Sequence, residues 1–433
     1  MELELRYVNK IKEAKIKLNG LTVIAGANSS GKSTVGRTLF TVIKAIANTK
    51  SLDNNMNKML WRKHIDSFYS RLRGLKINNK NQIFDEIPNS TYHFTNVFEN
   101  TVDKEKFIEN LKKIIAEQKS ITPRQKKLLE EDLNNLQIHI ENRNTAASLK
   151  TELQFLIESE FLNSFGSSRP HVEKALVELK SEEQFEVKFS AKDSFVEDDL
   201  KCSAKDTFSF IDDATYVESP LYIHLSDVII SSQTWRETEG RHSLLDRPMV
   251  PSHIKDMIEK IVWAARYTDR KVSSSSMNMN DITGGQLTFD PTTNQLIYKE
   301  GDYTFKTINV ASGIKTLSII QLLEDAKIIG PNSILIWDEP ENHLHPEWQI
   351  VFAEKLVELA KNGVPILITT HSPYFLQAIR TYSARDEMED FVNFYTPVEG
   401  DDHLETIVDV SDDLTSVFAT LAEPMNKIMD ING

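Results

Sequence analysis

The sequence predicts an α/β fold that an inserted helical domain divides into two parts. An apolar segment, Leu21–Ala25, is typical of a buried parallel strand and runs directly into a Gly-rich loop and a helix. After residue 213, apolar strands again alternate with helices. The chain between these two parts is polar and has helical periodicity. We therefore expect residues 1–48 and 214–383 to form one split α/β domain, 49–213 an inserted helical arm or cap, and 384–433 an acidic C-terminal segment.

Three short strands are expected at the N-terminus. The pattern of apolar residues places them at Leu3–Tyr7, Ala14–Leu18 and Leu21–Ala25. The helix after the Gly-rich loop has apolar residues three or four positions apart, which gives it one apolar face. These residues are Val35, Leu39, Ile43 and Ile46.

The insert is expected to contain three helices, at Phe107–Gln118, Pro123–Arg143 and Ala146–Phe165. The second has a proline in its first turn, where a missing N–H removes no helical hydrogen bond. A Glu- and Asp-rich stretch, Glu182–Asp213, completes the insert. The heptad spacing does not persist, which argues against a long parallel coiled coil.

The second part of the split domain opens with a strand at Thr215–Val217 and a helical region through Arg266, followed by strands near Gln286–Phe289 and Gln295–Lys299. The rest alternates helices with apolar strands, which is typical of a parallel sheet. These elements are a helix at Ala311–Ile328, a strand at Ile334–Trp337, a helix at Pro346–Lys361, a strand at Ile366–Thr370 and a helix at Pro373–Arg380.

The composition is that of a globular chain, with 40% hydrophobic and 26% charged residues among 433. No apolar run approaches the ~18 residues that a membrane-spanning helix needs, and the N-terminus has no signal-peptide pattern. The single cysteine, Cys202, excludes an internal disulfide and a cysteine-rich metal site. We expect a cytoplasmic protein with no membrane partner.

Charge is distributed unevenly along the chain, whose formal net charge is −14. Residues 1–80 contain 16 Lys and Arg but 5 Asp and Glu, whereas residues 384–433 contain 2 and 13. This asymmetry indicates either a charged partner surface or pairing of the two regions within the protein. A solvated tail beside an ordinary basic face is an equally good interpretation.

The Gly-rich loop, Gly26–Ser33, matches the phosphate-binding pattern G-x-x-x-x-G-K-S without a mismatch. Its glycines let successive N–H groups face phosphate oxygens, with the N-terminus of the helix behind them. Lys32 is expected to bridge the β- and γ-phosphates of ATP, and Ser33 to ligate Mg²⁺. The predicted nucleotide-binding residues of this loop are Gly26, Asn28, Ser29, Ser30, Gly31, Lys32, Ser33 and Thr34.

Two acidic residues, Asp338 and Glu339, follow the buried strand Ile334–Trp337. The carboxyl ends of the strands are where ligands of open α/β sheets bind. Asp338 is expected to hold the magnesium ion, and Glu339 to polarise the attacking water as a catalytic residue. Two carboxylates after a strand more commonly form a surface turn, but the phosphate-binding loop makes the catalytic interpretation the better one.

The order of these motifs resembles the head of ABC-type ATPases. A signature-like segment, Val310–Lys315, opens a helix; the hydrophobic-Asp-Glu-Pro motif follows, and the next strand ends in Thr-Thr-His-Ser-Pro. Transporter heads carry Leu-Ser-Gly-Gly-Gln at the signature, whereas Ile314 and Lys315 follow Gly313 here. The sequence Asp-Glu-Pro-Glu-Asn-His-Leu-His-Pro, residues 338–346, resembles the OLD/RecF/SMC-like branch. The resemblance covers roughly residues 1–48 and 214–380.

That resemblance implies ATP hydrolysis at composite sites shared between the subunits of a homodimer or higher homo-oligomer. Ser312 and Gly313 would reach the γ-phosphate of the nucleotide held by the partner subunit. His371, at the end of the next strand, would contact the γ-phosphate and the attacking water as a second catalytic residue. The implied cofactors are ATP and Mg²⁺.

Two features of the sequence admit more than one interpretation. Asn342–His345 would form the loop that crosses the dimer interface, whereas His343 and His345 read as metal ligands would lack a third partner. ABC heads also carry a glutamine that senses magnesium, for which Gln82 and Gln233 are candidates without specific support.

Many OLD-family proteins continue into a TOPRIM nuclease domain, which needs an Asp-x-Asp pair after a strand. No such pair follows Pro373 in this sequence. The chain therefore resembles the ATPase subunits of anti-phage defence systems such as PARIS and Septu. We expect an ATPase that acts as sensor and scaffold for a separate nuclease or toxin effector. The alternatives are a RecF/SMC-like ATPase that binds DNA in repair or DNA organisation, and a nucleotide-gated interaction module that scarcely hydrolyses ATP.

Overall fold

The computed structural model divides the chain into two compact units. Unit 1 comprises Met1–Ala47 and Lys150–Gly433, and unit 2 comprises Asn48–Leu149. The structure describes residues 1–49, 68, 104–117, 122–141, 145–162, 164–166, 174–181, 185–204, 211–226, 250–267, 277–293 and 295–431. The glutamine candidates Gln82 and Gln233 lie outside these ranges.

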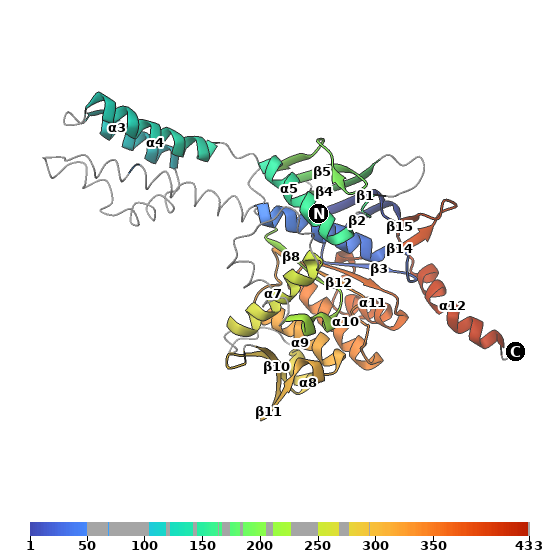
Figure 1. The fold of residues 1–433 in the computed structure, drawn as a ribbon. Coiled ribbons are helices and arrows are strands. Elements are labelled where there is room, and N and C mark those ends of the chain that lie inside the picture. The colour runs from blue at the N-terminus through green and yellow to red at the C-terminus, as the bar shows by residue number, and fades with distance from the viewer. Residues whose placement is uncertain are drawn as a thin grey trace. The chain divides into compact units, whose positions relative to one another are not determined.

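In its described part, unit 1 is built on a 12-stranded sheet of order β6-β5-β4-β1-β2-β15-β14-β3-β13-β12-β8, with β7 paired to β5 (Figure 1). The strands of its N-terminal half are β1 (Glu2–Val8), β2 (Ile11–Lys17), β3 (Leu21–Ala25), β4 (Ala175–Ser181), β5 (Phe185–Lys192), β6 (Phe195–Val196), β7 (Lys201–Ala204) and β8 (Asp213–Val217). The strands of its C-terminal half are β12 (Ser333–Asp338), β13 (Ile366–Thr370), β14 (Val392–Glu399) and β15 (Glu405–Asp409).

Five neighbouring strands, β14, β3, β13, β12 and β8, run parallel. Every residue of β3, β12 and β13 is buried, as expected for parallel strands covered on both faces. Because the strands are parallel, the loops after β3, β13, β12 and β8 all leave from the same edge of the sheet. The α/β fold predicted from the sequence is confirmed.

Helices cover both faces of the parallel strands (Figure 1). On one face lies the helix over residues 32–49, so close that a Cβ on Gly36 would come within 3.1 Å of Cγ2 of Ile336. On the other face the ring of Trp337 meets that of Phe352 edge-on at 5.1 Å. Since Ile336 and Trp337 are successive residues of β12, they point to opposite faces. The helices of the second half are α7 (Ser252–Tyr267), α8 (Met279–Thr283), α9 (Ser312–Asp325), α10 (Pro346–Lys361), α11 (Pro373–Arg385) and α12 (Thr415–Ile431).

Local sequence explains where these helices begin. Proline occupies the first turn of α10 and of α11, where its fixed φ favours the helix. The hydroxyl of Ser372 accepts a hydrogen bond from the N–H of Phe375 at 3.2 Å and caps α11. Both helices begin at the prolines where they were expected, and α11 continues five residues beyond the predicted end at Arg380.

A second, three-stranded antiparallel sheet precedes α9 in unit 1. Its strands are β9 (Gln286–Asp290), β10 (Gln295–Glu300) and β11 (Tyr303–Lys306). The short helix η2 (Thr307–Asn309) connects β11 to α9, which begins at Ser312. The two strands predicted near Gln286 and Gln295 are thus confirmed, and β11 was not predicted.

Unit 2 contains α3 (Lys104–Glu117) and α4 (Pro123–Glu141), both predicted from their periodicity. Their buried apolar residues recur three or four positions apart, as in helices that pack along one face. These residues are Ile108, Leu111 and Ile115 on α3, and Leu129 and Leu133 on α4. The third predicted helix is α5 (Thr145–Phe161), by which the chain returns from unit 2 to unit 1.

The structure differs from the predicted insert at its C-terminal end. The described residues 175–181 and 185–204, assigned to the helical insert, contain the strands β4 to β7. β4 pairs with β1 from Leu176 opposite Arg6 to Lys180 opposite Glu2. Alternate residues of β5, such as Val187 and Phe189, are buried. Glu178 of β4 and Glu186 of β5 lie between such buried positions, so the polarity of the stretch conceals a two-residue period.

The C-terminal residues 384–433 were expected to form a separate acidic segment, but part of this segment belongs to the main sheet. β14 and β15 lie within the sheet, between β3 and β2. Part of the charge asymmetry is paired across this junction, because Lys10 lies 3.1 Å from Glu405 and Lys12 lies 2.8 Å from Asp402. Pairing of the basic and acidic regions within the protein is therefore observed at these residues.

Within the described ranges, every helix is too short or too polar to cross a lipid bilayer.

Candidate active site

The Gly26–Ser33 loop connects β3 to the helix over residues 32–49 with a backbone that only certain residues tolerate. Ser29 and Gly31 have φ angles of +63° and +79°, in the left-handed region. A Cβ on Gly31 would lie 2.5 Å from Cδ1 of Ile11, so a larger residue would clash as well as strain the backbone. The N–H of Gly26 donates to the carbonyl of Thr370 at 3.1 Å and ties the start of the loop to β13.

The side chain of Lys32 is buried beneath this loop, with 4% of its surface exposed. Its ammonium group donates to the carbonyls of Gly26 at 3.0 Å and Ala27 at 2.7 Å. Burial lowers the pKa of Lys32, and the carboxylates of Glu339 and Asp338 oppose that shift. A cation held in this way is placed to bind an anion that enters the loop.

A cavity of about 250 Å³ opens above the loop. Its lining includes Glu339 from beyond the loop, and Asn9 and Lys10 from the turn between β1 and β2. The loop residues that line it are Asn28, Ser29, Ser30, Gly31, Lys32, Ser33 and Thr34. Gly26, the remaining residue predicted in this loop, lies at its base, where its carbonyl accepts from Lys32.

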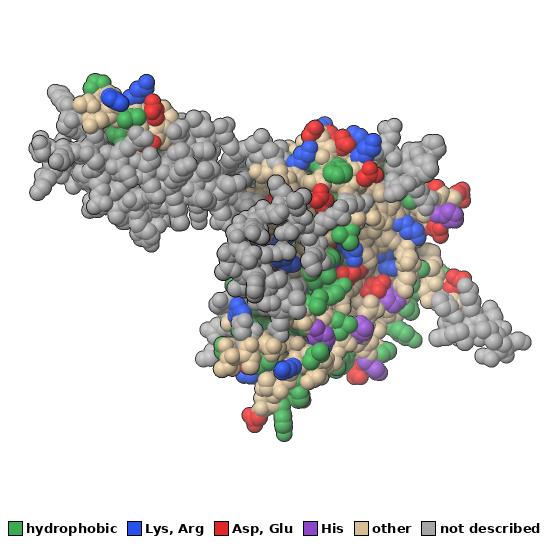
Figure 2. Space-filling model, viewed as in Figure 1, with side chains coloured by type: hydrophobic (Ala, Val, Ile, Leu, Met, Phe, Trp, Pro, Cys, Tyr) green, Lys and Arg blue, Asp and Glu red, His purple; other side chains and the backbone are tan. Residues whose placement is uncertain are grey.

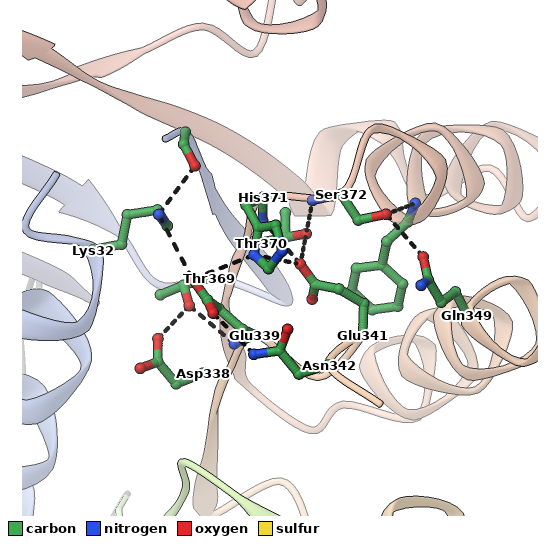
Figure 3. Close-up of polar contacts among 12 residues, drawn as sticks. Lys32, Asp338, Glu339, Glu341, Asn342, Gln349, Thr369, Thr370, His371 and Ser372 are labelled. Atoms are coloured by element: carbon green, nitrogen blue, oxygen red, sulfur yellow. Dashed lines mark hydrogen bonds and ion pairs between the residues drawn. The ribbon is translucent and has the colours of Figure 1, made fainter. Parts of the chain in front are cut away.

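Asp338, the last residue of β12, is buried at the same edge of the sheet. The hydroxyl of Thr369 donates to its Oδ1 (Figure 3). Thr369 lies directly across from Asp338 in the parallel pairing of β12 with β13. The carboxylate is therefore fixed by the sheet itself.

Glu339 leaves the strand with a φ of +46°, so its side chain points in a different direction from that of Asp338. Its N–H donates to both the carbonyl and the hydroxyl of Thr369 at 3.1 Å. Its Oε2 accepts from the amide of Asn342 at 2.9 Å. Its Oε1 lies 3.9 Å from Nζ of Lys32 and 3.4 Å from Nδ1 of His371 (Figure 3).

His371 follows β13, and its imidazole lies between two carboxylates. Nδ1 is 3.4 Å from Oε1 of Glu339 and 3.4 Å from Oε1 of Glu341. Glu341 is 4% exposed and accepts from the hydroxyl of Thr370 at 2.6 Å and from the N–H of His371 at 2.9 Å. Its burial raises the pKa of this carboxyl.

Glu341 is a site residue that sequence reasoning missed. It was quoted only as part of the motif, although its position two residues after Glu339 was the available signal. Its carboxylate accepts from the backbone N–H of His371 and lies 3.4 Å from Nδ1 of the ring (Figure 3).

Hydrogen bonds to Glu339 and to the first turn of α10 hold the loop at residues 342–345. The ring of His345 accepts from the N–H of Glu347 and caps α10, and His343 has a φ of +68°. Nδ1 of His345 is engaged in that cap at 3.4 Å. Among the residues that the structure describes, no three His, Cys, Asp or Glu side chains gather as a metal site, so the metal-ligand interpretation of His343 and His345 has no third ligand.

Ser312 and Gly313 form the N-terminus of α9. A Cβ on Gly313 would lie 3.1 Å from the carbonyl of His343 and 3.2 Å from the ring of Trp348, so glycine allows α9 to pack against the 342–345 loop. Neither Ser312 nor Gly313 is among the described residues that line the cavity. Direct contacts bring together Lys32 of the phosphate-binding loop, Glu339 and His371, and Thr369 connects Glu339 to Asp338. Asp338 and His371 also lie outside the cavity lining itself.

The chemistry of the site fits a magnesium-bound nucleotide. Lys32 and the N-terminus of its helix supply positive potential for phosphates. The hydroxyl of Ser33 and the carboxylate of Asp338 are hard oxygen donors of the kind that Mg²⁺ prefers, and each is near the loop where the phosphates would lie.

A family model described as "AAA ATPase domain" matches residues 9–376. Two curated proteins match shorter segments. The OLD nuclease of Thermus scotoductus is 32% identical over 93 residues, which are 21% of this chain and 18% of that protein. Protein ea59 of Escherichia phage lambda is 46% identical over 54 residues, 12% of this chain and 10% of that protein. Each match spans less than a fifth of the relative's length.

Solved structures with a similar chain trace include two SMC heads. The SMC head domain from Thermotoga maritima has a TM-score of 0.39 and 13% identity, with 94% of this chain and 98% of that chain covered. The Smc head domain with an extended coiled coil bound to the C-terminal domain of ScpA, derived from Pyrococcus furiosus, has a TM-score of 0.41 and 11% identity, with 100% and 99% covered.

Proposed function

The chain belongs to the AAA ATPase domain family, and on this premise we propose that it binds ATP with Mg²⁺ in the cavity above the Gly26–Ser33 loop and hydrolyses it there. The observation that carries the proposal is the meeting of three strand ends. β3 leads into Lys32, β12 ends in Asp338 and Glu339, and β13 leads into His371. These are the charges that phosphoryl transfer to water requires.

In the proposed mechanism, Lys32 exchanges its bonds to the loop carbonyls for the β- and γ-phosphates of ATP. The N–H groups of the loop bind the same phosphates, with Asn28, Ser29, Ser30, Gly31 and Thr34 shaping the loop. Ser33 and Asp338 would hold the magnesium ion. When bound, that ion neutralises charge that develops on the phosphate oxygens.

Glu339 is proposed to take the proton from the attacking water at Oε1. The other oxygen, Oε2, is engaged by the amide of Asn342, so the carboxylate has a fixed orientation with Oε1 toward Lys32 and His371. His371 is proposed to orient the γ-phosphate and the water, held from behind by Glu341. Positioning by such neighbours is the main protein contribution in this reaction class.

We further propose that Ser312 and Gly313 act on the nucleotide of a second subunit. The N-terminus of α9 is a ready anion site, yet in its own chain it is packed against the 342–345 loop rather than at the cavity. A homodimer of facing ATPase units would place this N-terminus at the partner's γ-phosphate.

The biological role that we propose is control of a separate nuclease or toxin effector in anti-phage defence. Support comes from the motif resemblance to defence ATPases and from the partial match to an OLD nuclease. Co-purification of the chain with the product of a neighbouring gene tests this role. Nuclease or toxin activity that depends on ATP in that complex is the expected result. If no such partner is found and the chain binds DNA with an affinity that falls steeply as salt concentration rises, the DNA-repair alternative is favoured instead.

Two substitutions test the ATPase mechanism. Lys32→Ala removes the buried cation, so ATP binding should weaken by at least about tenfold. Glu339→Gln keeps the shape of the side chain but removes the carboxylate that would take a proton from water, so ATP binding should persist while hydrolysis stops. Binding is measured by calorimetry and hydrolysis by phosphate release.

Matched controls are Lys12→Ala and Glu347→Gln, which alter an exposed lysine of β2 and an exposed glutamate of α10. Both should bind and hydrolyse ATP as the wild type does. Unchanged nucleotide affinity in Lys32→Ala would refute the loop assignment. Near-normal turnover by Glu339→Gln would move the catalytic role to another group, with His371 the first to test.

A further inference from the structure

Outside the cavity, unit 1 contains a row of four charged side chains of alternating sign, of which His253 and Glu160 are buried and Arg37 and Glu218 are half-buried. Nη2 of Arg37 donates to Oε1 of Glu218 at 2.6 Å. Oε2 of Glu218 lies 3.0 Å from Nε2 of His253, and Nδ1 of His253 lies 2.6 Å from Oε2 of Glu160. The N–H of His253 also donates to Oε1 of Glu160 at 2.8 Å. Four elements are thereby joined: the helix over residues 32–49, the end of β8, α7 and α5.

The centre of this row is sealed from solvent, since the side chains of His253 and Glu160 are 1% and 0% exposed. Both ring nitrogens of His253 face carboxylates, and only an imidazolium donates from both. The two carboxylates raise the pKa of His253, against the opposing effect of its burial. Two cations and two anions balance, which is the condition for keeping charges in a protein interior.

Glu218 places one end of this row at the edge of the sheet where the active site lies. In the parallel pairing of β8 with β12, Val217 lies across from Trp337. Glu218 and Asp338 are the next residues of their strands and point to the face covered by the helix over residues 32–49. Glu218 does not line the cavity above the phosphate-binding loop, and its carboxylate contacts Arg37, His253 and Tyr222 instead.

Two of these neighbours lead to functional elements. Arg37 lies on the helix that begins at Lys32, so its hydrogen bond to Glu218 connects Glu218 to the helix that follows the phosphate-binding loop. Tyr222, in the short helix η1 (Pro220–Leu225), donates a hydrogen bond of 3.1 Å from its hydroxyl to Oε2 of Glu218. In the same short helix, Nε2 of His224 lies 2.7 Å from Nζ of Lys315 on α9.

We propose that Glu160, His253 and Glu218 are positioning residues for ATP hydrolysis, which hold Arg37 and the phosphate-loop helix in register with the Asp338–Glu339 strand end. This inference rests on the ATPase function proposed above. Glu160 lies near the C-terminal end of α5, the helix by which the chain returns from unit 2. A displacement of α5 would therefore shift Glu160 and, through His253 and Glu218, the position of Arg37 on the phosphate-loop helix.

A purely structural role is the competing explanation, and a second charged cluster provides its control. Lys44 lies 2.9 Å from Asp213 and 2.5 Å from Asp256, and Lys260 lies 2.8 Å from each of these carboxylates. This cluster links the same helix, the start of β8 and the same α7. It lies at the end of β8 remote from the active-site edge, so it should stabilise the fold without positioning the site.

The experiment compares Glu160→Gln, His253→Gln and Glu218→Gln with the control Asp256→Asn in the full chain. For each variant, kcat and KM for ATP, the Kd for ATP and the melting temperature are measured. We expect kcat to fall about tenfold or more in the three row variants, with Kd changed much less, because outer residues that orient a site commonly contribute this much. Asp256→Asn should lower the melting temperature and leave kcat unchanged.

The double variant Glu160→Gln, His253→Gln should be no slower than the worse single variant, because residues that act as one unit are not additive. Wild-type kcat in folded Glu160→Gln and Glu218→Gln would overturn the proposal, as would a fall in kcat of equal size in Asp256→Asn. If His253→Gln does not fold, these two carboxylate variants decide the outcome. Failure of the proposed ATPase function would look different. In that case the wild type and Lys32→Ala would show the same ATP turnover, whatever the row variants do.

Discussion

Glu341 shows how one buried carboxylate fixes a site without facing its cavity. It accepts from the hydroxyl of Thr370 and the N–H of His371, and its burial raises the pKa of this carboxyl. Ser372 continues the arrangement, since its N–H donates to the hydroxyl of Thr370 at 3.0 Å. Glu341 and the hydroxyl of Thr370 therefore hold the backbone of the loop after β13 together, and with it the position of His371.

We predict that Glu341→Ala destabilises the protein by about 3 kcal/mol, because it leaves two buried donors without an acceptor. Glu341→Gln retains an oxygen at the same place and should cost about 1 kcal/mol or less. Denaturant-induced unfolding measures both, and kcat should fall further in the alanine variant because the ring of His371 loses its support. Glu347→Ala, on the exposed start of α10, is the control. An unfolding midpoint for Glu341→Ala equal to that of the wild type would contradict this role.

Single residues of the site were predictable to different degrees. Lys32 and Gly31 are marked by a motif whose spacing follows from phosphate geometry, and the structure places both at the loop as that motif requires. Glu341 was not marked, because its role depends on Thr370 and His371, which lie some 30 positions away in sequence. A hydrogen bond between distant residues has no local signature.

At the scale of elements, the row that joins α5, α7 and the end of β8 should make stability depend on pH. His253 has a raised pKa in the folded protein and an ordinary pKa of about 6.5 when unfolded. Its contribution to the free energy of unfolding is therefore fully present below about pH 6.5 and is lost as pH rises through the raised folded value. The titratable groups that face it are Glu160, Glu218 and Tyr216, whose ring lies 4.8 Å from the imidazole, and Glu218 also faces Arg37 and Tyr222.

We predict that the wild type loses stability relative to His253→Gln as pH rises from about 6 to about 9. The comparison with the variant is needed because His224 has a lowered pKa and acts in the opposite direction. Urea unfolding at several pH values measures the difference. Parallel pH dependence in the two proteins would show that His253 does not carry a bound proton in the fold.

Elements were predictable where periodicity and length agreed. β3, β13 and α10 were predicted with the bounds that the structure shows, because continuous apolar runs and a proline at the first turn of a helix are local signals. β4, β5, β14 and β15 were not predicted as strands. Their polar residues are frequent, and their burial depends on pairing with β1, β2 and β3 far away in sequence.

At the scale of the whole molecule, the proposed two-chain site predicts complementation. Lys32→Ala and Ser312→Arg chains should each be inactive, but a mixed dimer has one composite site with an intact Lys32 and an intact Ser312. Mixing them should restore up to about a quarter of wild-type hydrolysis, if half of the dimers are mixed and the sites act independently.

ATP binding by the mixture is measured beside hydrolysis, because strong coupling between sites would suppress turnover alone. Glu347→Gln mixed with Lys32→Ala controls for simple dilution of an inactive chain. If the mixture of Lys32→Ala and Ser312→Arg regains neither ATP-dependent dimers nor binding at the repaired site, each chain serves its own nucleotide and the two-chain site is wrong.

The position of β14 and β15 has a consequence for how the protein is made. β2 and β3 are neighbours in sequence, but β15 and β14 separate them in the sheet. The ribosome releases β2 and β3 at the beginning of synthesis and β15 only after Asp409. At about 5–20 residues per second, the first strands wait roughly 20–80 s for their partners. During that time the edge of β3 is open to pairing with other nascent chains, so the yield of native protein should depend on chaperones that shield it.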